Sequence, residues 1–200
     1  MLRSSLTVLA LALLFANPAR ATPAVGSPAP DFTATGSNGE QVKLAGLRGK
    51  IVVLEWTNDG CPYCAKWYGS GQMQALQRHA TAKGVVWLSV ISSAPGNEGY
   101  VDGAGANQDT ASRNAAPTHV LLDPTGTLGH LYDAVTTPEI YIIKPDGTLA
   151  YSGGIDSIDS ADPADIPSAE PYAREALDEV LAGSPVKNPV TEPYGCSVKY

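Results

Sequence analysis

The chain has 200 residues, of which 44% are hydrophobic and 16% charged, so one globular domain is expected. This composition excludes a coiled coil, a collagen-like repeat and a wholly disordered chain. Acidic residues outnumber basic ones by 20 to 13, which gives a net charge of −7, and no run of basic residues occurs. Nucleic-acid binding through phosphate neutralisation is therefore not expected. Three cysteines and three histidines are too few for a disulfide-stapled miniprotein or a multi-metal centre.

The first 21 residues have the layout of a secretory signal peptide. Arg3 precedes an apolar stretch at residues 6–16, and Ala19-Arg20-Ala21 provides an A-x-A cleavage pattern. The stretch is shorter than the ~20 residues that span a bilayer. Pro18 and the A-x-A pattern favour cleavage over the alternative, an uncleaved membrane anchor. We therefore expect an exported, periplasmic protein that is not stably inserted in a membrane after cleavage and whose cysteines can form disulfides.

Apolar runs between turn residues predict the strands of an α/β sheet. Asn38-Gly39 between two short runs is a hairpin signal. The runs at residues 50–56 and 85–91 suit strands that are buried on both faces. The expected strands cover residues 31–34, 41–44, 50–56, 85–91, 119–122, 140–143 and 148–151.

Helices alternate with these strands. Pro62 suits a first helical turn and Gly84 a C-terminal stop. Gly69 and Gly71 should break or kink this helix, because each costs about 1 kcal/mol relative to alanine. The expected helices cover residues 62–83, 106–114, 128–132 and 172–182, with a long surface loop at 155–171. The chain is thus divided into a signal peptide (1–21), an α/β domain (22–182) and a proline-containing tail (183–200).

The motif that carries chemistry is Cys61-Pro62-Tyr63-Cys64, after a strand and a short loop and at the start of a helix. Positions three apart share one side of a helical turn, so the two sulfurs can form a disulfide without large strain. The helix N-terminus lowers the pKa of its first cysteine. Cys61 would attack a partner's disulfide, and Cys64 would then attack the mixed disulfide and release the partner. No organic cofactor is required, because the redox equivalents reside in the cysteine pair.

Two other roles of the Cys61–Cys64 pair fit the sequence less well. A structural zinc site would need more ligands, but the sequence has no second CxxC, and its histidines show no paired spacing. A purely structural disulfide over three residues would constrain the unfolded chain little. Cys196 is the odd cysteine in the tail. It could resolve a Cys61 intermediate, link two chains or be a bystander.

Four stretches carry a family resemblance: Ala29-Pro30-Asp31-Phe32, Leu47-Arg48-Gly49-Lys50, the CPYC tetrapeptide and Thr136-Thr137-Pro138. With them the chain resembles the thioredoxin-like superfamily over about residues 29–182. It looks most like the exported redoxin branch shared by TlpA-type thiol–disulfide oxidoreductases and AhpC/TSA peroxiredoxins. The resemblance implies a thioredoxin-like fold, with a central mixed β-sheet flanked by helices and an N-terminal β-hairpin extension.

The resemblance also implies roles for three further residues. Thr137-Pro138 would be a cis peptide beside the CxxC, exposing the backbone of Thr137 to an extended substrate segment; an ordinary trans proline is the alternative. Glu55 would lie under Cys64 and accept its proton; the alternative is a carboxylate at a solvated edge. The implied partners are protein thiols or disulfides and a redox partner protein.

Departures from these families bear on the reaction. Peroxiredoxins have Pro-x-x-x-Thr-x-x-Cys, whereas Leu54 and Asn58 stand at the proline and threonine positions here. Arg113 could approach the site. TlpA-type proteins usually have tryptophan before the first cysteine, where this chain has Gly60. The sequence thus predicts an exported thiol–disulfide oxidoreductase. The alternatives are a peroxiredoxin-like peroxide reductase using Cys61, a copper-binding chaperone and a redox-dead interaction module.

Overall fold

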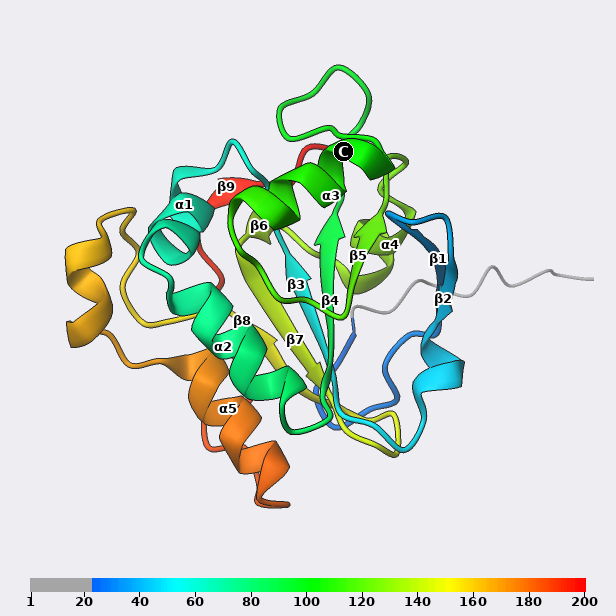
Figure 1. Ribbon diagram of the computed structural model, residues 1–200. Coiled ribbons are helices and arrows are strands. Elements are labelled where there is room, and N and C mark those ends of the chain that lie inside the picture. The colour runs from blue at the N-terminus through cyan, green and yellow to red at the C-terminus, as the bar shows by residue number, and fades with distance from the viewer. Residues whose placement is uncertain (1–22) are drawn as a thin grey trace, which may run out of the picture.

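The computed structural model describes residues 23–200, so the expected signal peptide lies outside the described residues. Seven strands form one mixed sheet, shown in Figure 1. Their order is β2 (Gln41–Lys43), β1 (Thr33–Gly36), β5 (His119–Leu122), β4 (Val86–Ile91), β3 (Val52–Trp56), β7 (Glu139–Ile143) and β8 (Leu149–Gly153). Strands β3, β4 and β5 are parallel, whereas β1, β7 and β8 are antiparallel to their neighbours. This is the mixed α/β sheet that the sequence predicts.

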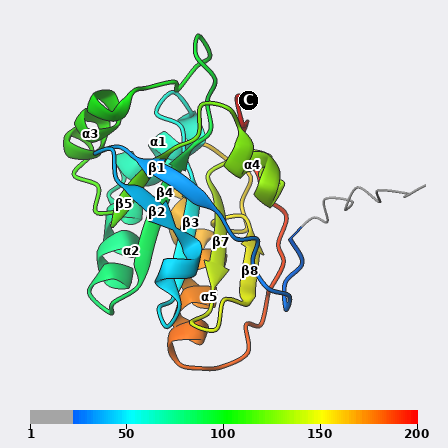
Figure 2. The same ribbon diagram turned by 90° about the vertical axis from the view of Figure 1, so that its right-hand side faces the viewer.

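Helices cover both faces of the sheet, as Figures 1 and 2 show from two directions. One face carries α1 (Pro62–Gly69), α2 (Gln72–Thr81), α3 (Gly103–Ser112) and α5 (Tyr172–Leu181). The other face carries the 3-10 helix η1 (Leu44–Leu47) and α4 (Thr127–Tyr132). Side chains alternate along the buried central strand, so Val53 packs with α1, α2 and α5, while Leu54 packs on the opposite face.

The hairpin and the helix break are confirmed. β1 and β2 pair antiparallel, and Gly39 in their turn has a φ of +83°. The predicted long helix is two helices, because α1 ends at Gly69 and α2 begins after Gly71. Gly71 has a φ of +76°, in the left-handed region where a Cβ is unfavourable. The break redirects the chain while both helices stay on the same face.

Three segments differ from the expectation. α3 begins at Gly103, before the expected helix start at residue 106, because the Asp102 side chain caps it by accepting a hydrogen bond from the Gly105 amide. The surface loop at 155–171 contains a 3-10 helix, η2 (Pro163–Ser168), capped in the same way by Asp162. The tail folds back on the domain, where β9 (Cys196–Ser197) pairs with β6 (Thr136–Thr137). A two-residue strand is too short to leave a periodic pattern in the sequence.

No helix within residues 23–200 combines the length and the apolar character needed to cross a membrane.

Candidate active site

Cys61 and Cys64 lie where the central strand β3 passes into helix α1. The intervening loop is held by Asn58, whose side chain accepts a hydrogen bond from the Gly60 amide at 2.8 Å. Cys61 is the N-cap residue of α1, Pro62 is its first residue, and Cys64 lies in its first turn. All three cysteines of the chain are free thiols, and Cys61 and Cys64 are both buried. The structure thus places the pair at a helix N-terminus, as the spacing predicts.

The two sulfurs have opposite pKa shifts. Hydrogen bonding with the Cys64 thiol, followed by contacts with Cys196 and Thr137, lowers the pKa of Cys61 to about 4 despite its burial. Burial, followed by the interactions with Cys61, raises the pKa of Cys64 well above its usual value. Cys61 is therefore the thiol that ionises, and Cys64 remains a protonated donor beside it. This division suits a nucleophile and a resolving thiol.

The peptide bond between Thr137 and Pro138 is cis, so this prediction is confirmed. The carbonyl oxygen of Thr137 lies 3.1 Å from Cys61 Sγ, which donates to it when protonated. On the other side, Thr137 is the residue opposite Cys196 in the β6–β9 pair. The backbone of Thr137 thus lies directly beside the nucleophilic sulfur.

Glu55 is fully buried, so a position at a solvated edge is wrong. Its Oε1 accepts a hydrogen bond from the Tyr68 hydroxyl at 2.6 Å. Its Oε2 accepts hydrogen bonds from Gln77 at 3.0 Å, Trp87 at 2.7 Å and Ser89 at 2.9 Å. This network joins β3, β4, α1 and α2.

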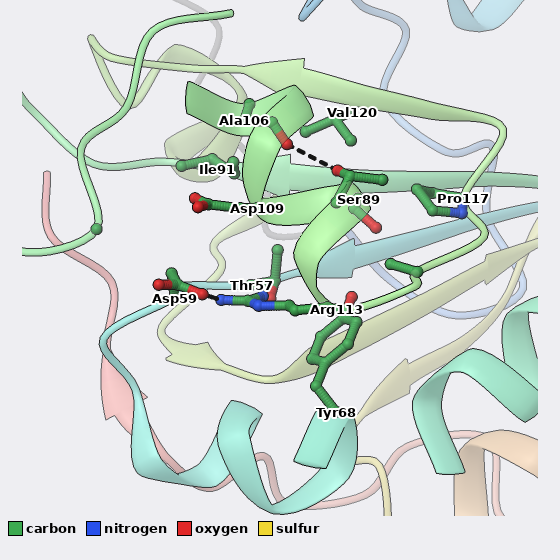
Figure 3. Close-up of a pocket in the computed structure, with 13 residues that line it drawn as sticks. Thr57, Asp59, Tyr68, Ser89, Ile91, Ala106, Asp109, Arg113, Pro117 and Val120 are labelled. Carbon is green, nitrogen blue, oxygen red and sulfur yellow. Dashed lines mark hydrogen bonds and ion pairs between the residues drawn. The ribbon is translucent and has the colours of Figure 1, made fainter. Parts of the chain in front are cut away.

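Cys64 is contacted by Thr57, a residue that no sequence pattern marks as part of the site. The Thr57 hydroxyl donates to Cys64 Sγ at 3.7 Å and lowers the pKa of this thiol against the larger effect of burial. A cavity of about 30 Å³ is lined by Thr57 and by Tyr68 and Ser89, two of the donors to Glu55 (Figure 3). A cavity of this size holds one water molecule. The cavity therefore adjoins the residues around Glu55 and the residue that contacts Cys64.

Arg113 contacts Asp59 and Tyr68. Its guanidinium group forms an ion pair with Asp59 (Figure 3). The same group lies 4.7 Å from the centre of the Tyr68 ring. Asn58, at the position of the peroxiredoxin threonine, binds the loop backbone instead. In residues 23–200 no group of three or more His, Cys, Asp or Glu residues could hold a metal ion.

The comparisons with known proteins agree with this geometry. Residues 25–152 match the model of the AhpC/TSA family. The chain belongs to this family. It is 27% identical over 126 residues to the thiol-disulfide oxidoreductase ResA of Bacillus subtilis, a match that covers 62% of this chain. The match spans 64% of ResA, which is less than two thirds of that protein.

Similar solved structures confirm the thioredoxin-like fold. An uncharacterized conserved protein from Geobacillus kaustophilus has a TM-score of 0.76 and 26% identity, covering 88% of this chain and 92% of that one. A secreted disulfide oxidoreductase of Mycobacterium tuberculosis, homologous to E. coli DsbE, has a TM-score of 0.52 and 20% identity. This match covers 76% of the present chain and 95% of the other.

Proposed function

We propose that the chain is an exported thiol–disulfide oxidoreductase that exchanges disulfides with protein partners through Cys61 and Cys64. The observation that carries the proposal is the pair of opposite pKa shifts at one helix N-terminus, with Cys61 lowered to about 4 and Cys64 raised. The similarity to ResA supports the same reaction. Cleavage after Ala21 and a periplasmic location belong to this proposal, as does the division into a domain at 22–182 and a tail at 183–200.

The reaction runs in two exchanges. The Cys61 thiolate attacks one sulfur of the partner's disulfide, so a bond forms between Cys61 and the partner while the partner's second sulfur leaves as a thiolate. Cys64 then attacks Cys61 Sγ, the mixed disulfide breaks, and the partner's first sulfur leaves as a thiolate. The partner gains two electrons and this chain loses two. A further redox partner protein resets the Cys61–Cys64 disulfide, or the same steps run in reverse.

The proton of Cys64 has to leave during the second exchange. We propose Glu55 as its acceptor, reached through the small cavity rather than by direct contact. Thr57, which contacts Cys64 Sγ, and Tyr68, whose hydroxyl donates to Glu55, both line this cavity. A water molecule in the cavity would connect the two sides.

Cys196 is proposed as a second, slower resolving thiol. Burial, followed by its hydrogen bond with Cys61, raises the pKa of Cys196 to about 11, so it is protonated at neutral pH. When its thiolate attacks Cys61 Sγ of the mixed disulfide, a Cys61–Cys196 bond forms and the partner's sulfur leaves as a thiolate. The disulfide that is attacked accepts the two electrons, so the step needs no added oxidant.

Reduction of a small disulfide reporter by the dithiol tests the proposal. Wild type should reduce the reporter, Cys61→Ser should be inactive, and Cys64→Ser should accumulate a mixed disulfide through Cys61. Cys196→Ser is the matched control and should keep the activity. Equal activity of wild type and Cys61→Ser would refute the proposal.

A further inference from the structure

The end of the chain lies across the candidate active site. We call residues 190–200 the C-terminal arm. Its strand β9 pairs with β6, with Cys196 opposite Thr137. In Figure 1 this red segment lies beside β6, near the N-terminal end of α1. Gly195 passes so close that a Cβ there would lie 2.1 Å from the Thr137 carbonyl oxygen. The arm therefore occupies the backbone edge of β6 next to Cys61.

Tyrosines hold the arm on both sides of this contact. Before β9, the Tyr194 hydroxyl donates a hydrogen bond to Asp156 Oδ1, and its ring centre lies 5.8 Å from that of Tyr63. After β9, the Tyr200 ring stacks on His130 with centres 3.9 Å apart. Between the two tyrosines, the β6–β9 pair is extended by hydrogen bonds from the Val198 amide to the Val135 carbonyl and from the Ala94 amide to the Lys199 carbonyl. A partner segment that takes the place of the arm has to replace these contacts.

The nucleophile is buried in the structure, in which the arm is docked. Cys61 is 0% exposed, although a thiol that attacks a partner's disulfide has to be reached by the partner's sulfur. An extended partner segment that paired with the Thr137 backbone would need the edge that β9 already takes. Arm and partner therefore cannot occupy this edge together.

We propose that the C-terminal arm is a tethered mimic of the partner, and that a partner protein reaches Cys61 by displacing it. This inference rests on the proposed function and adds the kind of partner segment. That segment is extended and carries a cysteine at the position of Cys196. The position before the cysteine takes glycine, because a Cβ there meets the Thr137 carbonyl. The position before that takes an aromatic residue, which fills the place of Tyr194 between Tyr63 and Asp156.

The rate at which Cys61 is alkylated measures how readily the arm leaves β6. The reduced full-length protein is treated with iodoacetamide at neutral pH, and labelling of each cysteine is followed by mass spectrometry. Gly195→Ala forces the arm off β6 without removing Cys196. Gly183→Ala is the matched control: its φ of +70° is also positive, but no atom lies within 4 Å of its added Cβ. Gly195→Ala should be labelled at Cys61 about tenfold faster than wild type or more, a shift of about 1.4 kcal/mol in arm docking.

A second variant and a peptide complete the test. Tyr200→Ala removes the outer anchor at a distance from Cys61 and should also speed the labelling of Cys61. A synthetic peptide of residues 190–200 carrying Cys196→Ser should slow the labelling of Gly195→Ala. The same peptide with Tyr194→Ala added should lose this protection.

The outcomes distinguish the proposed role of the arm from the proposed disulfide exchange. Equal labelling of Cys61 in wild type, Gly195→Ala and Tyr200→Ala would overturn the inference, as would labelling of Gly183→Ala as fast as that of Gly195→Ala. Equal protection by both peptides would refute the aromatic position. Alkylation needs no disulfide exchange, so arm-dependent labelling in a protein that never reduces a disulfide would refute the proposed function alone.

Discussion

Replacing Glu55 by glutamine exchanges one buried carboxyl oxygen for an NH2 group and isolates the role of the buried carboxyl group. The carboxyl accepts four hydrogen bonds from Tyr68, Gln77, Trp87 and Ser89. A glutamine amide has one acceptor oxygen, which would face the three donors now on Oε2. Its NH2 group would face the Tyr68 hydroxyl, which then has to rotate and accept instead of donating.

The expected cost follows from this single mismatch. A buried donor that loses its acceptor costs about 1–3 kcal/mol. Glu55→Gln should therefore lower the free energy of unfolding of the reduced protein by about 1–3 kcal/mol, measured by urea denaturation. Ser89→Ala is the matched control, because it removes one donor and leaves the carboxyl with three. It should cost about 1 kcal/mol or less.

The same variant tests the proton acceptor. If Glu55 takes the proton of Cys64, Glu55→Gln slows the release of a mixed disulfide at Cys61, whereas Ser89→Ala releases it at nearly the wild-type rate. Release is followed by stopping the reaction with acid and separating the species by mass. A Glu55→Gln protein with the wild-type free energy of unfolding and release rate would refute both the structural and the catalytic reasoning.

Three further predictions concern neighbouring residues. Because the pKa of Cys61 is lowered to about 4, its thiolate should persist at every pH above that value. The ultraviolet absorbance of the thiolate should fall only near pH 4 and should be missing in Cys61→Ser. A transition near pH 9 would contradict this prediction. Thr57→Val removes the hydroxyl that lowers the pKa of Cys64. Release of the mixed disulfide should therefore slow at neutral pH and recover at higher pH. An unchanged pH profile would show that the Thr57 hydroxyl has no effect on the Cys64 thiol. Lys66 pairs with Asp156 at 3.4 Å, and both side chains are fully buried. Lys66→Met should therefore lower the free energy of unfolding, measured by urea denaturation, by about 3–5 kcal/mol. A decrease below about 1 kcal/mol would show that the ion pair is not essential for stability.

Local patterns were sufficient to predict most of the fold. The apolar run of β3, the hairpin turn at Asn38-Gly39 and the break at Gly69 and Gly71 depend on residues close together in the sequence, and the structure has all three. The start of α3 was missed because a single capping bond at Asp102 outweighs a glycine-rich composition. Propensity alone does not include such a cap.

The site was predictable where either the motif or the family resemblance includes its residues. Cys61 and Cys64 are read from their spacing, and the Thr137-Pro138 cis bond from a family resemblance. The contact of Cys196 with β6 joins positions 59 residues apart, and neither segment has a strand-like pattern. Thr57 has no sequence signal either, because its role depends on how the loop after β3 turns toward Cys64.

The most direct test of the account is the linkage between the two sulfurs of the motif. The full-length protein is equilibrated with glutathione buffers of stepped ratio, thiols are trapped with acid and alkylating reagent, and the peptides are mapped by mass spectrometry. Cys196→Ser is run in parallel so that linkage to the arm cannot contribute. We predict that Cys61 and Cys64 pass reversibly between a mutual disulfide and two free thiols as the ratio changes. A protein in which the two sulfurs are never linked to each other at any ratio would contradict the account.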